Sequence, residues 1–180
     1  MQGQKNIVLG VTASIAIYKA CDLVRRLQDE KFSVTCVMTD EARELINPVV
    51  FQSLTGNRVY SRMFNEPDAW EIGHISLASK ADIVIIAPAT ANVIGKMACG
   101  ICDDLLTCTV CATTAPVVVC PAMNDNMYKN KVVRDNIARL RSLGYKIVEP
   151  ASGKLACGSI GVGCLADVAH IVAQVKKILK

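Results

Sequence analysis

The chain has 180 residues and a formal net charge of +4; 52% of its residues are hydrophobic and 20% are charged. This composition fits one folded domain over residues 1–180 and excludes an intrinsically disordered chain. No apolar run is long enough to span a membrane, no signal peptide opens the chain and the basic residues do not cluster. We therefore predict a cytoplasmic protein without a membrane or nucleic-acid partner.

Short apolar runs alternate with amphipathic stretches along the chain. The runs predict strands at residues 6–11, 33–38, 82–87, 117–120 and 146–148. Apolar residues at helical spacing predict helices at residues 14–28, 130–143 and 167–179. Unbroken β-branched strands separated by helices indicate a parallel sheet covered on both faces. We therefore predict a single-domain α/β fold with a doubly wound parallel sheet, a Rossmann- or flavodoxin-like arrangement of three layers.

In such sheets, ligands bind beyond the carboxyl ends of the strands. Four of these ends carry small or polar turn residues, namely GVTASIAIYK (10–19), VMTDEA (37–42), IAPATANVIGK (86–96) and VCPAMNDNMY (119–128). We expect these four turns to converge on one edge of the sheet and to form the ligand site there.

The first strand end places Thr12, Ala13 and Ser14 where strand gives way to helix. Backbone N–H groups at a helix start, together with hydroxyl donors, suit an anion such as a phosphate. Ser14 could equally cap the helix, and the sequence alone leaves these two interpretations about even. The glycine pattern of dinucleotide-binding proteins and the phosphate loop of nucleoside triphosphatases are both absent.

Nine cysteines in a chain without an export signal indicate reduced thiols. Cys99, Cys102, Cys108 and Cys111 are spaced like two pairs of zinc ligands. The second pair, however, lies in the apolar, helix-like run 105–112, so we interpret these cysteines as small residues that fill a core and predict no metal site.

Cys157 has a different setting from these cysteines. It lies in GKLACGSIGVGC (153–164), where four glycines predict a loop rather than a core element. A thiol in a glycine-rich loop is a candidate reactive group. Cys164 ends the same segment, and we assign it no role.

These turns together resemble those of the flavin-dependent cysteine decarboxylases. The resemblance covers nearly the whole chain and depends on TASIAIYK (12–19), IGHISLASKAD (72–82), APATANVIGKMACGICDDLLT (87–107), PAMNDNMY (121–128) and ACGSIGVG (156–163). It implies an enzyme of coenzyme A biosynthesis that decarboxylates 4'-phosphopantothenoylcysteine to 4'-phosphopantetheine and CO₂. The implied route is oxidation of the thiol to a thioaldehyde, loss of CO₂ and reduction of the resulting enethiol.

The resemblance also implies a bound cofactor, FMN, and an oligomer. The implied FMN-binding residues, the first three at its phosphate end, are Ala13, Ser14, Ile15, Thr39, Asp40, Glu41, Thr90, Ala91, Asn92, Val93 and Ala122. The family forms homotrimers or dodecamers built from trimers, with FMN near the subunit contacts. In many bacteria the domain is fused ahead of phosphopantothenate–cysteine ligase, so we expect this chain to be fused to that enzyme or to work with it.

By the same resemblance, His74 is the catalytic base and Cys157 the proton donor of the final reduction. A lone histidine is more often structural, and the resemblance reverses that preference for His74 alone. Asn124 would bind the substrate carboxylate; an uncharged amide suits a group whose charge must leave during the reaction. Met127 would shape the pocket wall, and Lys154 would contact the phosphate or carboxylate end of the substrate.

Two residues near Asn124 stand apart from this assignment. Tyr128 occupies a position where the family often has tryptophan, which affects the expected substrate preference only slightly. Asn126 has no role that the sequence indicates.

Four alternatives remain. A peptidyl-cysteine decarboxylase would stop at a C-terminal enethiol, and the Ala-Cys-Gly segment argues against it. A flavin prenyltransferase relative would not need both His74 and the asparagine-methionine turn, and a non-catalytic flavin-binding subunit would tolerate the loss of His74 or Cys157. The last alternative is a zinc-binding structural module.

Overall fold

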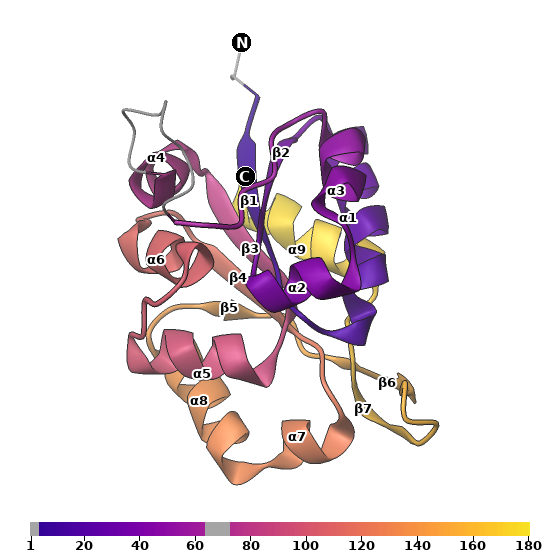
Figure 1. The fold of residues 1–180 in the computed structure, drawn as a ribbon. Helices are drawn as coiled ribbons and strands as arrows, with labels where there is room; N and C mark the ends of the chain where they lie inside the picture. The colour runs from indigo at the N-terminus through magenta and orange to yellow at the C-terminus, as the bar shows by residue number, and fades with distance from the viewer. Residues whose placement is uncertain (1–3, 64–72) are drawn as a thin grey trace.

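A computed structural model describes residues 4–63 and 73–180 of the chain. Residue 72, the first of the histidine-bearing stretch, lies outside the described residues. The described part contains a five-stranded parallel sheet with the strand order β2-β1-β3-β4-β5 (Figure 1). The strands are β1 (Asn6–Val11), β2 (Ser33–Met38), β3 (Ile83–Ala89), β4 (Val117–Pro121) and β5 (Lys146–Ile147). The predicted fold class is therefore confirmed.

Helices cover both faces of this sheet (Figure 1). Leu9 of β1 packs into the core on one face and its neighbour Val8 into the core on the other, because successive side chains of a strand point in opposite directions. The first core is covered by α1 (Tyr18–Asp29), α2 (Asp40–Leu45), α3 (Pro48–Thr55) and α9 (Val168–Ile178). The second is covered by α4 (Gly73–Lys80), α5 (Ala91–Cys99), α6 (Leu105–Ala112) and α8 (Lys131–Ser142).

The predicted element bounds need small corrections. β1 and β2 have the predicted bounds, whereas β3 continues to Ala89, which pairs with Pro121 of β4 after a shift in register. The predicted helix 14–28 begins as a separate 3-10 turn, η1 (Ile15–Ile17), before α1. The helices predicted at 130–143 and 167–179 are α8 and α9, whose N-caps are Asn130 and Asp167.

Four strand ends share one device for starting the next helix. Ser14, Thr39, Thr90 and Asn124 follow β1, β2, β3 and β4, and each is an N-cap. Each side-chain oxygen accepts a hydrogen bond from a backbone N–H two or three residues later. In the structure, the polar side chains predicted at the sheet edge therefore act as helix caps. Of the two interpretations of Ser14, the structure shows the capping one.

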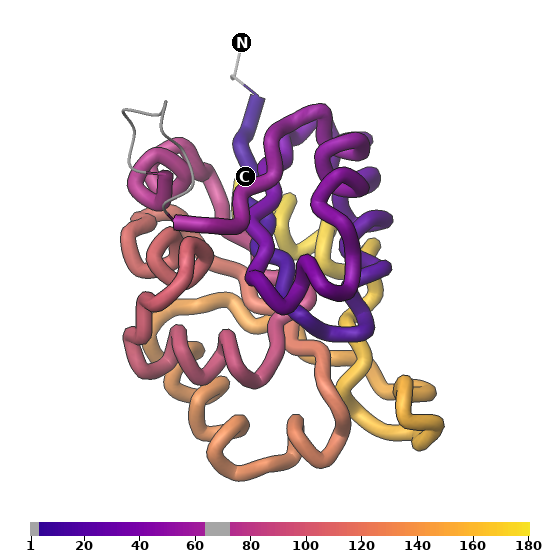
Figure 2. Tube along the Cα trace, in the orientation of Figure 1, coloured from indigo at the N-terminus to yellow at the C-terminus, as the bar shows by residue number. Residues whose placement is uncertain are grey.

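The prediction of a loop for the glycine-rich segment is correct only for residues 155–159, because the residues on either side of them form strands. Strands β6 (Ala151–Lys154) and β7 (Ile160–Cys164) form an antiparallel hairpin that projects beside α7 (Asp125–Lys129) (Figure 2). The hairpin lies outside the main core, so its two strands are held together by main-chain hydrogen bonds. Such bonds do not need side chains, and glycines are therefore tolerated. Cys157 lies in the connecting turn, where Gly158 has a φ of 89°.

The four cysteines with zinc-like spacing also differ from their predicted placement. Cys99 and Cys111 are exposed, and Cys102 and Cys108 are partly buried, because Leu105 and its apolar neighbours occupy the core-facing side of α6. Burial raises the pKa of the Cys102 thiol to about 11. Within residues 4–63 and 73–180, no three His, Cys, Asp or Glu side chains are grouped so that they could hold a metal ion.

The helices have modest lengths. Over the same two ranges of residues, none is both long enough and apolar enough to cross a membrane.

Candidate active site

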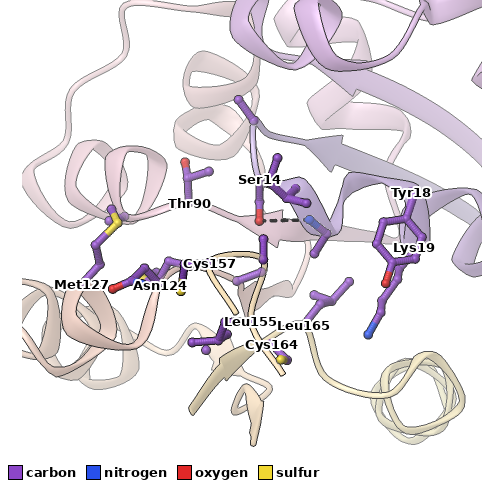
Figure 3. Close-up of a pocket in the computed structure, with 18 of the residues that line it drawn as sticks. Ser14, Tyr18, Lys19, Thr90, Asn124, Met127, Leu155, Cys157, Cys164 and Leu165 are labelled. Atoms are coloured by element: carbon purple, nitrogen blue, oxygen red, sulfur yellow. Dashed lines mark hydrogen bonds between the residues drawn. The ribbon is translucent and has the colours of Figure 1, made fainter. Parts of the chain in front are cut away.

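A cavity of about 550 Å³ lies at the carboxyl ends of β1, β3 and β4, at the predicted edge of the sheet (Figure 3). Its volume is within the usual range for small-molecule sites. The residues that follow these strands form one part of its wall, and the β6–β7 hairpin with its connecting turn forms another. The predicted site residues that line the cavity are Ala13, Ser14, Ile15, Thr90, Ala91, Ala122, Asn124, Met127, Lys154 and Cys157.

The buried Thr12 fixes two of these strand ends against each other. Its Oγ1 donates to the carbonyl oxygen of Pro88 at 2.7 Å and accepts from the N–H of Thr90 at 3.0 Å. Because both polar contacts of the hydroxyl are made inside the protein, Ala13 and Thr90 are held at fixed positions on the cavity wall.

Five residues predicted to bind FMN lie outside this cavity. Both Asn92 and Val93 belong to α5, where Val93 is buried in the core and Asn92 is exposed. Thr39, Asp40 and Glu41 start α2 at the end of β2, and Asp40 forms an ion pair with Arg43 at 3.0 Å. Their assignment to FMN stays a prediction.

His74 is also absent from the cavity wall. It lies in the first turn of α4, which packs against α6, whereas Cys157 lies in the hairpin at the other end of the molecule (Figure 1). Within one copy of the chain, the two predicted catalytic residues are therefore apart.

Asn124 and Cys157 do meet at the cavity. The Oδ1 atom of Asn124 accepts from the N–H of Asn126 at 2.9 Å, which fixes the orientation of the amide. The Nδ2 atom then points at the Cys157 sulfur, 3.4 Å away. The role that the sequence did not show for Asn126 is thus a backbone one, because its N–H orients the Asn124 side chain.

Ser159 is a site residue that sequence reasoning missed. Its Oγ lies 3.1 Å from the Cys157 sulfur. Donation by this hydroxyl, then by the Ser159 backbone N–H and by Asn124, lowers the pKa of the Cys157 thiol below its ordinary value. The sequence did contain a signal for Ser159, because its hydroxyl lies two residues after a candidate reactive cysteine.

Replacing Ser159 by alanine is expected to raise the pKa of Cys157 toward its ordinary value, because the largest stabilisation of the thiolate is lost. The pH midpoint for iodoacetamide labelling of Cys157, followed by peptide mass spectrometry, should therefore shift upward. Ser152→Ala removes an exposed hydroxyl of the same hairpin and should leave the midpoint unchanged. An unchanged midpoint in Ser159→Ala would contradict this assignment.

Glycines allow the hairpin to approach the Asn124 turn closely. The N–H of Met123 donates to the carbonyl oxygen of Gly163 at 2.9 Å. A Cβ on Gly163 would lie 2.1 Å from the Met123 oxygen, and one on Gly161 would lie 2.8 Å from the Asp125 Cβ. The strand that carries these glycines therefore docks directly on the turn that carries Asn124.

Two further cavity residues, Tyr18 and Lys19, come from the first turn of α1. Sequence reasoning placed them within a helix and considered only the start of that helix. Lys19 and Lys154 bring two cationic side chains to the cavity wall. Cys164 lines it as well, with its thiol 3.7 Å from the carbonyl oxygen of Lys154, which it reaches across the hairpin.

The fold and the site define a class: a flavodoxin-like α/β protein with a cavity at the carboxyl edge of its sheet and a thiol-bearing hairpin that forms part of the cavity wall. The family model described as Flavoprotein matches residues 1–180, and the chain belongs to this family.

Three individual proteins illustrate the relationship. The coenzyme A biosynthesis bifunctional protein CoaBC of Bacillus subtilis (strain 168) is 45% identical over 177 residues, which are 98% of this chain and 44% of that protein. The probable phosphopantothenoylcysteine decarboxylase of Streptococcus mutans serotype c is 41% identical, covering 97% of this chain and 99% of that protein. The crystal structure of SpaF, among the FMN-dependent cysteine decarboxylases, matches with a TM-score of 0.86 and 31% identity over 98% of both chains. The chain thus spans less than half the length of the bifunctional relative.

Proposed function

We propose that residues 1–180 form one FMN-binding domain that decarboxylates 4'-phosphopantothenoylcysteine to 4'-phosphopantetheine in coenzyme A biosynthesis. The observation that carries this proposal is the contact between the Asn124 amide and the Cys157 thiol over one cavity. An amide can bind a carboxylate and a thiol can deliver a proton, and a decarboxylation followed by protonation needs both groups at one site. The names of the relatives in Bacillus subtilis and Streptococcus mutans support the substrate.

The cavity suits a flat aromatic cofactor such as FMN. Ala13, Ala91 and Ala122 stand at three adjacent strand ends and leave room beside the sheet edge, and most of the cavity wall is apolar. Ser14 and Ile15 at the start of η1 would hold the phosphate end, and Thr90 and Ala91 would border the ring. Bound FMN would supply the electron sink that loss of CO₂ from a cysteine needs.

Asn124 would bind the substrate carboxylate through its Nδ2 donor. The N–H of Asn126 fixes this donor toward the cavity, so little reorganisation is needed on binding. A neutral donor stabilises the starting carboxylate less than an arginine would, which matters because that charge disappears when CO₂ leaves.

Cys157 would protonate the substrate carbon during reduction of the enethiol, with its proton delivered from the Sγ atom. Its lowered pKa makes the thiol a stronger acid than an ordinary cysteine while Ser159 stabilises the thiolate left behind. Lys154, on the same hairpin and on the cavity wall, would contact an anionic end of the substrate.

We also propose that the chain assembles as homotrimers or dodecamers, in which His74 of one copy completes the site of another. The support is that His74 does not line the cavity of its own chain. Coexpressed His74→Ala and Cys157→Ser subunits should recover activity, because mixed oligomers contain sites with both native residues. No recovery would show that both residues act within one chain. Cooperation with the ligase that makes the substrate, and a cytoplasmic location, stay predictions.

The decisive experiment is an assay of the purified protein with 4'-phosphopantothenoylcysteine and product identification by mass spectrometry. We expect yellow protein, release of CO₂ and phosphopantetheine as the product. Accumulation of enethiol by the native chain would instead indicate an enzyme of the peptidyl-cysteine type. Protein that cannot be loaded with FMN, or that leaves the substrate unchanged, would overturn the proposal.

A further inference from the structure

Tyr128 is anchored by polar contacts that the reaction itself does not use. Its hydroxyl donates to Oε2 of Glu149 at 2.6 Å, and Arg141 forms an ion pair with the other carboxylate oxygen. The Arg134 guanidinium lies 5.0 Å from the centre of the Tyr128 ring, and Tyr128 is only 5% exposed. Burial, followed by the hydrogen bond to Glu149, raises the pKa of Tyr128 to about 12, so its hydroxyl remains a donor at neutral pH.

The contacts of Tyr128 with Glu149 and Arg134 bear on the position of the turn that carries Asn124. Tyr128 lies one helical turn after Asn124, and its N–H donates to the Asn124 carbonyl oxygen at 3.0 Å. The helix that Asn124 caps and that contains Tyr128, α7, has only five residues. A helix this short gains little from its own hydrogen bonds, so its position depends on tertiary contacts. The buried Tyr128 side chain supplies such a contact.

Glu149, which accepts the hydrogen bond from Tyr128, lies close to the hairpin in the sequence. Glu149 lies two residues before β6, the strand that runs up to the turn containing Cys157. Arg141 of α8 holds the same carboxylate from a second side. The bond between Tyr128 and Glu149 therefore joins the base of the hairpin to the helix that Asn124 caps.

We propose that Tyr128 and Glu149 are positioning residues that hold the Asn124 turn and the Cys157 hairpin in register, so that the amide and the thiol meet over the cavity. The inference deepens the proposed function and rests on it for its effect on turnover. Neither side chain lines the cavity, so both act through Asn124 and Cys157 rather than on substrate.

The test compares Tyr128→Phe, Glu149→Ala and Glu149→Gln in FMN-loaded protein. The first two remove the hydrogen bond, and we expect kcat/KM to fall about tenfold, in line with the loss of a bond to a charged group, with more enethiol among the products. Glu149→Gln keeps an oxygen that can accept from Tyr128 and should retain most activity. The double variant Tyr128→Phe with Glu149→Ala should be no worse than Glu149→Ala alone, because Glu149→Ala already removes the hydrogen bond that Tyr128→Phe removes.

A second readout does not depend on substrate. Loss of the Asn124 donor should shift the pH midpoint of Cys157 labelling upward, and Asn124→Ala measures that shift directly. Tyr128→Phe and Glu149→Ala should shift it in the same direction. Lys131→Ala is the matched control, because it breaks an exposed ion pair with Asp135, 2.7 Å long, on the neighbouring α8.

The outcomes separate the two proposals. Native protein that does not turn over the substrate, together with shifted labelling in the variants, would reject the function and retain the positioning role. Active native protein with native kinetics and labelling in both Tyr128→Phe and Glu149→Ala would overturn the positioning role. That role would also be overturned if these variants lose thermal stability while their labelling and product ratio match those of Lys131→Ala.

Discussion

Replacing Cys157 by serine is expected to leave decarboxylation possible but to release the enethiol in place of phosphopantetheine. A serine hydroxyl is a far weaker acid than a thiol whose pKa is lowered by Ser159, so the final protonation loses its proposed donor. General acids contribute about 10²–10⁴-fold to such steps, and formation of the reduced product should fall by that order. Asn124, the residue proposed to bind the carboxylate, is unchanged in this variant. Mass spectrometry distinguishes the two products by their hydrogen content.

Cys99→Ser provides the control for loss of a thiol. Cys99 is exposed at the end of α5 and does not line the cavity, so this variant should form phosphopantetheine at the native rate. Native product from Cys157→Ser would remove Cys157 from the proposed role, whatever the fate of the rest of the mechanism.

Replacing Gly163 by alanine is expected to lower kcat/KM about 100-fold, because a displacement of about 1 Å at a reacting group can cost that much. The new Cβ would lie 2.1 Å from the Met123 backbone oxygen, and the residue has a φ of 158°. A backbone atom cannot move aside as a flexible side chain can, so β7 must lift away from the Asn124 turn. The thermal midpoint should change little, because the hairpin lies outside the main core.

Limited trypsin digestion measures the lifting itself. Lys154 lies in β6, and cleavage after it should accelerate in Gly163→Ala. Gly153→Ala is the matched control, since its Cβ would meet only the Cys164 sulfur, at 3.3 Å, and that side chain can adjust. Native activity together with native resistance to trypsin in Gly163→Ala would show that the close contact between β7 and Met123 is unnecessary.

Local sequence patterns determined the parallel sheet and the edge at which the site lies. The apolar runs predicted the bounds of β1 and β2, because a strand buried on both faces consists mostly of apolar residues. Thr90 and Asn124 were found at strand ends because capping needs a particular side chain within a few residues of its partner. Cys157 stood out from the other cysteines by its glycine-rich neighbours. Each of these signals lies within a short stretch of chain.

Tertiary structure decided what depends on segments distant in the sequence. Gly161 and Gly163 indicated a loop by their local pattern, yet their use is the close packing of β7 on Met123 and Asp125. Tyr128 and Glu149 are 21 residues apart, and their hydrogen bond exists only because the sheet order brings α7 beside the start of the hairpin. The placement of His74 away from the cavity follows in the same way from the packing of α4 against α6. No local propensity encodes such contacts, since their partners are chosen by the global register of the sheet and its layers.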